Sequence, residues 1–166
     1  MKLPRREFLH LSATGAALPV LSQVATAQPN DTAKQLFGSW KLTSWIIQVV
    51  GEDATEPLGA TPKGRMIITA DGYMAMIATA DRQHVTNRDE KALLNSLLAY
   101  SGKFTIDGDK FTTKVDLSWN EFYTGQDQVR FFDMEGDKLT IRTAEQISAA
   151  LPNKKIVGIL TWEREQ

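Results

Sequence analysis

The sequence predicts a mainly β protein, in which eight antiparallel strands follow one another and close into an up-and-down barrel with one short helix between strands 3 and 4. Short apolar runs are separated by turn sequences at Asp71-Gly72, Gly108 and Gly136, and a single leucine-rich stretch has helical spacing. Closure of the sheet would remove the exposed edges that promote aggregation. A barrel of this size is either filled by side chains or holds one small ligand.

The first 27 residues have the features of a twin-arginine-type signal peptide. Lys2, Arg5 and Arg6 form a basic start, a mildly apolar stretch follows at residues 8–21, and an Ala-Thr-Ala cleavage sequence ends at Ala27. The apolar stretch is shorter than the roughly 20 residues of a membrane span. We therefore expect a periplasmic protein whose signal peptide is cleaved near Ala27, with no stable membrane insertion afterwards.

After cleavage, residues 28–35 would form a flexible lead and residues 36–166 one barrel domain. Removing the signal's three basic residues and one acidic residue from totals of 19 and 20 leaves 16 basic and 19 acidic residues, a net charge of −3. This charge, without a basic stripe, argues against nucleic acid as a partner. The chain has no cysteine, so neither a disulfide nor a cysteine-linked lipid is expected.

The predicted helix begins after Asn87, which is placed as an N-cap with Glu90 three residues further on. Four leucines then fall on one helical face, which must cover another part of the molecule: Leu93, Leu94, Leu97 and Leu98.

The strands at residues 65–80 are expected to form a hairpin with apolar residues on both faces. A two-residue turn at Asp71-Gly72 would pair Ala70 with Tyr73. One face would then carry Met66, Ile68, Tyr73, Ala75 and Ile77, and the other Ile67, Met74 and Met76. One of these faces would line the barrel interior and the other would lie under the helix.

Arg130 stands in a stretch that otherwise has the character of a buried strand. A turn on either side of Gly136 puts Arg130 and Gln128 on the same face as Phe132. If that face is interior, the guanidinium needs a partner or a ligand, because burying an isolated charge is costly. The alternative is a structural arginine that pairs with an internal carboxylate or stacks on a tryptophan.

Five segments of the chain follow one another in a characteristic order and spacing: "GSWKLTSW", "PKGRMIITADGYM", "YSGKF", "DGDKFTTKVDLSWNEFYTGQDQVRFF" and "GDKLTI". With these segments, about residues 36–162 resemble the bacterial lipocalin-like domain family, which consists of exported β-barrels of the calycin type. The resemblance implies a small antiparallel barrel with a cavity and, for most members, no established activity. Trp119, Gly125, Gln128 and Arg130 match residues that the family typically carries at these positions. Where the resemblance implies one or two histidines, this chain has Thr113 and Lys114, which weakens any histidine general base.

The chain has few residues that could form a metal site or a nucleophilic catalytic site. His84 is the single histidine beyond the signal, so a site built from several histidines or cysteines is excluded, and neither a metal nor a cofactor is expected. Asp81, Asp89 and Glu90 are better explained as helix-start electrostatics than as a cation site. A Ser-His-Asp triad would have to recruit His84 from a polar loop, without a nucleophile elbow.

Two functions remain open, and a purely structural or stress-linked domain with a filled barrel is a third alternative. The first is a periplasmic lipocalin-like protein that binds a small, mainly apolar or amphipathic molecule in the barrel cavity, with a carboxylate, carbonyl or phenolic oxygen held by Arg130 and Gln128. The expected ligand contacts are Arg130, Gln128, Trp45, Met74, Met76, Phe104, Trp119 and Tyr123. The alternative is a cofactor-free isomerase, cyclase or lyase, in which barrel-lining Asp116 is the general base and Arg130 stabilises an enolate-like oxyanion. Fold alone does not separate them.

Overall fold

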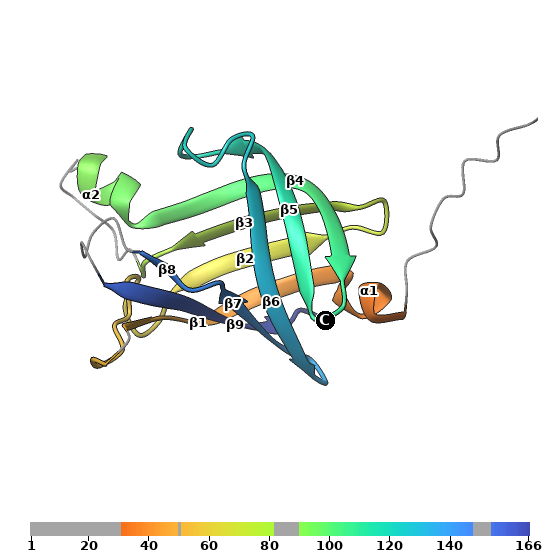
Figure 1. Cartoon of the computed structure of the whole chain (residues 1–166), viewed down its shortest axis with the longest axis horizontal. Helices are drawn as coiled ribbons and strands as arrows, with labels where there is room; N and C mark the ends of the chain where they lie inside the picture. Colours follow the sequence, from red (N-terminus) through yellow and green to blue (C-terminus); the bar gives the residue numbers. More distant parts are fainter. Residues whose placement is uncertain (1–30, 50, 82–89, 148–153) are drawn as a thin grey trace, which may run out of the picture.

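The computed structural model describes residues 31–49, 51–81, 90–147 and 154–166 (Figure 1). The predicted signal peptide, His84 and Asn87 lie outside these residues. The elements are α1 (Asp31–Leu36), β1 (Gly38–Val49), β2 (Lys63–Ile68), β3 (Tyr73–Thr79), α2 (Glu90–Asn95), β4 (Leu97–Asp107), β5 (Lys110–Ser118), β6 (Asp127–Glu135), β7 (Lys138–Thr143), β8 (Gln146–Ile147) and β9 (Lys155–Arg164).

The strands form one closed antiparallel barrel, as predicted. Each of β1 to β6 pairs with the next strand, β7 pairs with β9, and β9 pairs again with β1 to complete an eight-stranded circuit. The two-residue strand β8 continues the line of β7 along β9. The turns at Gly108 and Gly136 are the predicted two-residue connections, and both glycines have positive φ, of 64° and 62°.

The register of the β2–β3 hairpin differs by one residue from the prediction. Ile68 pairs with Met74, because the connection spans the four residues 69–72, in which Thr69 bonds to Asp71 and to the backbone of the next strand. A slip of one residue exchanges the two faces of a strand. The inward side chains are therefore Met66, Ile68, Met74 and Met76, whereas Ile67, Tyr73, Ala75 and Ile77 are exposed outside.

A short helix does lie between β3 and β4, but the predicted four-leucine face is wrong. α2 ends at Asn95, and Leu97 and Leu98 are already the first residues of β4, where they pair with Thr79 and Ala78. Pairing of the β4 backbone with β3 thus overrides the helical spacing of the leucines. Leu94 is left exposed at 53%.

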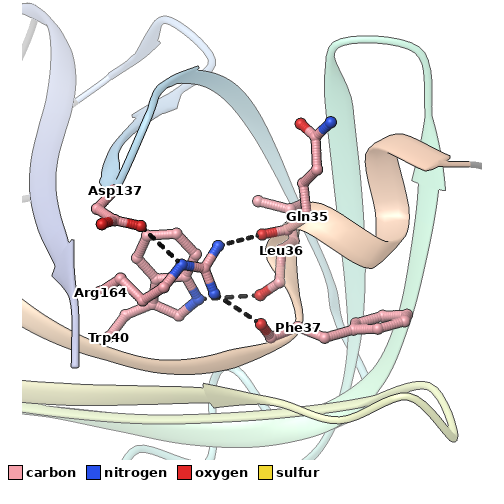
Figure 2. A network of polar contacts seen from close by, with 6 residues as sticks. All are labelled: Gln35, Leu36, Phe37, Trp40, Asp137 and Arg164. Carbon is pink, nitrogen blue, oxygen red and sulfur yellow. Dashed lines mark hydrogen bonds and ion pairs between the residues drawn. The ribbon is translucent and has the colours of Figure 1, made fainter. Parts of the chain in front are cut away.

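Helix α1, which the sequence did not predict within the polar lead, closes one end of the barrel (Figure 1). Leu36 is fully buried, and Trp40 donates its indole N–H to the Leu36 carbonyl at 2.9 Å. The guanidinium of Arg164 lies 4.1 Å from the centre of the Trp40 ring (Figure 2). It also donates to the carbonyls of Phe37 (2.9 Å) and Gln35 (2.5 Å) and to the carboxylate of Asp137 (3.2 Å). This end is therefore sealed by side chains.

Candidate ligand-binding site

The two ends of the barrel differ in how completely their inward side chains are buried. At the α1 end, the inward residues Trp40, Leu139 and Trp162 have no exposed surface. At the opposite end, where α2 lies (Figure 1), Val49, Ala78 and Ile156 are buried, but five other inward residues are only half-buried: Trp45, Ile47, Gln128, Arg130 and Thr143. Solvent therefore reaches part of the barrel interior from the α2 end.

Arg130 lies on the inward face of β6, between Gln128 and Phe132. The pairing of Phe132 with Ile141 and of Arg130 with Thr143 gives this face, since Phe132 and Ile141 are buried in the core. The guanidinium Nη2 donates to Gln128 Oε1 and Nη1 donates to the Val129 carbonyl, each at 2.8 Å. Neither partner carries a charge.

No internal carboxylate offsets this charge in the part of the chain that the structure describes. Every described Asp and Glu side chain is exposed except Glu165, which is half-buried and bonded to Arg65. The described tryptophan that stacks with a guanidinium is Trp40, and its partner is Arg164. Neither structural alternative predicted for Arg130 is found among the described residues.

Tyr100 lies beside Arg130 inside the barrel. Burial raises the pKa of the Tyr100 hydroxyl, and the charge of Arg130 and its hydrogen bond to Tyr100 oppose this rise. The Tyr100 ring is parallel to the Tyr123 ring, with the two centroids 6.4 Å apart. The Tyr123 ring in turn packs on Trp119, with ring centroids 5.1 Å apart. Two predicted site residues, Trp119 and Tyr123, thus extend an aromatic wall from Tyr100 into the turn between β5 and β6.

The other predicted apolar contacts lie at different depths. Met76 is the cross-strand partner of Tyr100 and belongs to the same level of the barrel. Met74 and Phe104 lie further toward the sealed end, where they are 1% and 7% exposed, and Phe104 packs on Phe111 with centroids 5.2 Å apart. Met74 and Phe104 therefore belong to the packed floor below the Arg130 level.

Trp45 reaches the interior from β1. It shares the inward face with Ile47, which pairs with Gly158 of β9. The Gly158 amide donates to Thr143 Oγ1 at 2.9 Å, and a Cβ at Gly158 would lie 3.2 Å from Thr143 Cγ2 and 3.8 Å from Trp45 Nε1. Glycine at this position keeps the space beside Trp45 and Thr143 free of a side chain.

The prediction that Asp116 lines the barrel is wrong. Its side chain is exposed, and it accepts a hydrogen bond from the outward Ser101 hydroxyl at 2.9 Å. A bulge between β4 and β5, where Ser101 pairs with Leu117 but Gly102 pairs with Val115, leaves Asp116 without a place in the inward alternation. The proposed general base is therefore not in the interior.

Thr113 occupies the inward position at which the family resemblance implied a histidine. Its side chain is completely buried, and its hydroxyl has no hydrogen-bond partner among the described residues. A threonine hydroxyl has no basic nitrogen, so this position cannot supply a histidine-type base.

Sequence reasoning missed Tyr100, Thr143 and Gly158 as parts of the site. Tyr100 could have been found from its spacing, since Tyr100, Gly102 and Phe104 alternate along one inward face of β4. Thr143 and Gly158 carry no such signal, because their roles depend on the pairing of β7 and β1 with β9.

A model of the lipocalin-like domain matches residues 37–165 of the chain. The protein belongs to the lipocalin-like domain family. Comparison with curated proteins gives no match. The lipocalin-like barrel fits small-molecule binding, and the family assignment by itself names no ligand.

Within its described residues, the lipocalin-like chain has no group of three His, Cys, Asp or Glu side chains that could hold a metal ion. No helix in the described part is long and apolar enough to cross a membrane.

Proposed function

We propose that this is a periplasmic lipocalin-like protein that binds one small, mainly apolar molecule inside the barrel, at the end opposite α1. The observation that carries the proposal is the contrast between the sealed end around Trp40 and the half-buried inward side chains around Arg130. Ligand pockets typically combine apolar and aromatic walls with a few polar groups. Met76, Tyr100 and Trp45 supply such walls here, and Arg130 and Gln128 supply the polar groups. The basic, apolar and Ala-Thr-Ala features of residues 1–27 support the proposed location.

The alternative function, a cofactor-free isomerase, cyclase or lyase, required Asp116 as a general base inside the barrel, but Asp116 lies outside it. Arg130 alone is a charge stabiliser and does not abstract a proton at neutral pH. We therefore keep binding as the proposed function.

Native mass spectrometry of the protein purified from its own periplasm tests this function. We expect a stoichiometric small molecule in the native mass that is absent after denaturing extraction, and a protein mass that corresponds to cleavage after Ala27. An empty protein that also fails to bind Nile red would point instead to a barrel filled by its own side chains.

A pair of variants on one strand assigns the binding to the interior. Thr143 faces inward and Thr140 faces outward on β7. Thr143→Phe should reduce bound ligand or Nile red affinity at least about tenfold, because the new ring occupies the space beside Trp45. Thr140→Phe should leave binding unchanged, and circular dichroism should show that both variants are folded. Equal effects of the two variants would place the bound molecule outside the barrel.

A further inference from the structure

This inference rests on the proposed function and specifies its ligand. We infer that the bound molecule is a carboxylic acid with an apolar body, and that Arg130 and Gln128 hold its carboxylate inside the barrel.

Within the described part of the chain, several hydrogen-bond donors around Arg130 have no acceptor. A guanidinium has five N–H donors, and among the described residues the contacts to Gln128 Oε1, the Val129 carbonyl and the Tyr100 hydroxyl use three of them. Because the Gln128 side-chain oxygen accepts a hydrogen bond from Arg130, the Gln128 amide nitrogen points away from the guanidinium and is a further donor. Burial keeps the Tyr100 hydroxyl protonated at neutral pH, so it also can donate. A cluster of this kind is matched by a group that only accepts hydrogen bonds.

The charge balance selects an anion. The described carboxylates are exposed, apart from Glu165 on Arg65, so no described acidic side chain neutralises Arg130 in the interior. A half-buried cation without a counter-charge favours a ligand that brings one negative charge. Ketones bring no charge, and phenols, with a pKa near 10, are neutral at pH 7. A carboxylate is ionised at neutral pH, and its two oxygens match the planar fork of a guanidinium.

The surrounding walls specify the rest of the molecule. Met76, Trp45 and the Tyr100–Tyr123 pair provide apolar and aromatic surface at the level of Arg130, and below them Met74 and Phe104 form a closed floor. The acid group is therefore held near the solvent-reached end. An aliphatic or aromatic acid fits this arrangement better than a small polar anion does.

Binding of decanoate and of 1-decanol, measured by calorimetry and by displacement of Nile red, tests the inference. Wild-type protein should bind decanoate more tightly than 1-decanol, by roughly 10- to 100-fold, the range expected for a charge-assisted contact. Arg130→Met should remove this preference and leave 1-decanol and Nile red binding within about twofold. Arg130→Lys should give an intermediate preference, because lysine keeps the charge but lacks the fork.

Arg142→Met is the matched control, since Arg142 is exposed and points outward on the neighbouring strand β7. It should not change either affinity. Should Arg130→Met fail to fold, the pH dependence of the wild-type protein decides. Decanoate affinity should fall toward that of 1-decanol as the pH drops below the carboxylic acid's pKa of about 4 to 5, while 1-decanol affinity stays constant.

The possible failures are distinct. If Nile red, decanoate and 1-decanol all fail to bind, the proposed binding function itself is wrong. If decanoate and 1-decanol bind equally and Arg130→Met changes neither, binding stands and the carboxylate inference is overturned. If the Arg130→Met variant still prefers decanoate to 1-decanol, the carboxylate inference is also overturned, because a group other than Arg130 then binds the carboxylate.

Discussion

Arg130 and Arg164 are both arginines of the barrel, but their guanidinium groups have different partners. Arg164 forms a hydrogen bond through each of its three guanidinium nitrogens: it lies on the face of Trp40, donates to two backbone carbonyls and pairs with Asp137 (Figure 2). Arg130 has only neutral partners at its guanidinium and no carboxylate partner among the described residues. Burial alone does not distinguish a structural arginine from one that awaits a ligand. The set of partners does.

Arg164→Met should therefore destabilise the fold by roughly 2–4 kcal/mol, since the carbonyls of Gln35 and Phe37 lose charge-assisted donors and Trp40 loses its cation. Urea unfolding monitored by tryptophan fluorescence measures this change. Arg142→Met, at an exposed position, should stay within about 0.5 kcal/mol of wild type. If the two variants proved equally stable, the Arg164 contacts would be too weak to seal this end of the barrel.

At the scale of elements, the bulge between β4 and β5 shapes the open end. It places Asp116 outside, and the turn that follows is tied back to β5 by hydrogen bonds between Val115 and the backbone of Gln126 and Gly125. Trp119 and Tyr123 are in this turn and thereby reach Tyr100. The bulge depends on Gly102, because a Cβ there would lie only 2.0 Å from the Lys114 carbonyl oxygen.

Gly102→Ala should lower the stability by about 3 kcal/mol or more, because the clash is with backbone and two strands must separate to relieve it. Thermal unfolding provides the measurement. Gly158→Ala is the control, since the nearest atom to its Cβ would be a Thr143 side-chain carbon at 3.2 Å, which can move. We expect it to cost about 1 kcal/mol. A Gly102→Ala protein as stable as the Gly158→Ala protein would contradict the close strand approach at the bulge.

At the scale of the whole molecule, the barrel has one sealed end and one end at which solvent reaches some inward side chains, including Arg130 and Gln128. Tyr100, beside Arg130, makes the stability of the entire fold depend on pH. Its pKa is raised by burial above the ordinary value of about 10, so the folded state holds the phenolic proton more tightly than the unfolded chain does. The contribution is complete below pH 10 and is lost as the pH rises from about 10 through the folded-state pKa.

Urea unfolding of wild type and Tyr100→Phe between pH 8 and about 11.5 tests this prediction. The difference in unfolding free energy between the two proteins should be constant up to about pH 10 and should then change by up to about 1.4 kcal/mol per pH unit, to the disadvantage of wild type. Taking the difference cancels the titration of lysines, which both proteins share. Parallel curves over the whole range would show that the folded state does not protect this proton.

Local pattern was sufficient for much of the fold. Turns at Gly108 and Gly136 follow from the need for positive φ in two-residue hairpins, and the shared face of Gln128, Arg130 and Phe132 follows because either choice of turn leaves their spacing of two unchanged. The strand order and barrel closure followed from the number of strands and the shortness of their connections.

The predictions failed where a single residue shifts a strand register or where strand pairing overrides a local pattern. Hydrogen bonds of Thr69 lengthen the β2–β3 turn, and the resulting register exchanges the inward and outward faces expected for β3. The bulge at Gly102 turns Asp116 outward, and Leu97 and Leu98 belong to β4 instead of the predicted helix. Helix α1, with six residues, is too short to show a period.

The sequence by itself determined the class of this protein, an antiparallel barrel, and the shared face of Gln128, Arg130 and Phe132, because strand alternation and turn chemistry are local properties of the chain. Only the tertiary structure decided which end is sealed and what surrounds Arg130. The seal joins Arg164 near the end of the chain to Trp40 near the start of the barrel, and the absence of a described internal carboxylate is a property of all the strands together. Neither can be read from neighbouring residues, since both arise from contacts between distant strands.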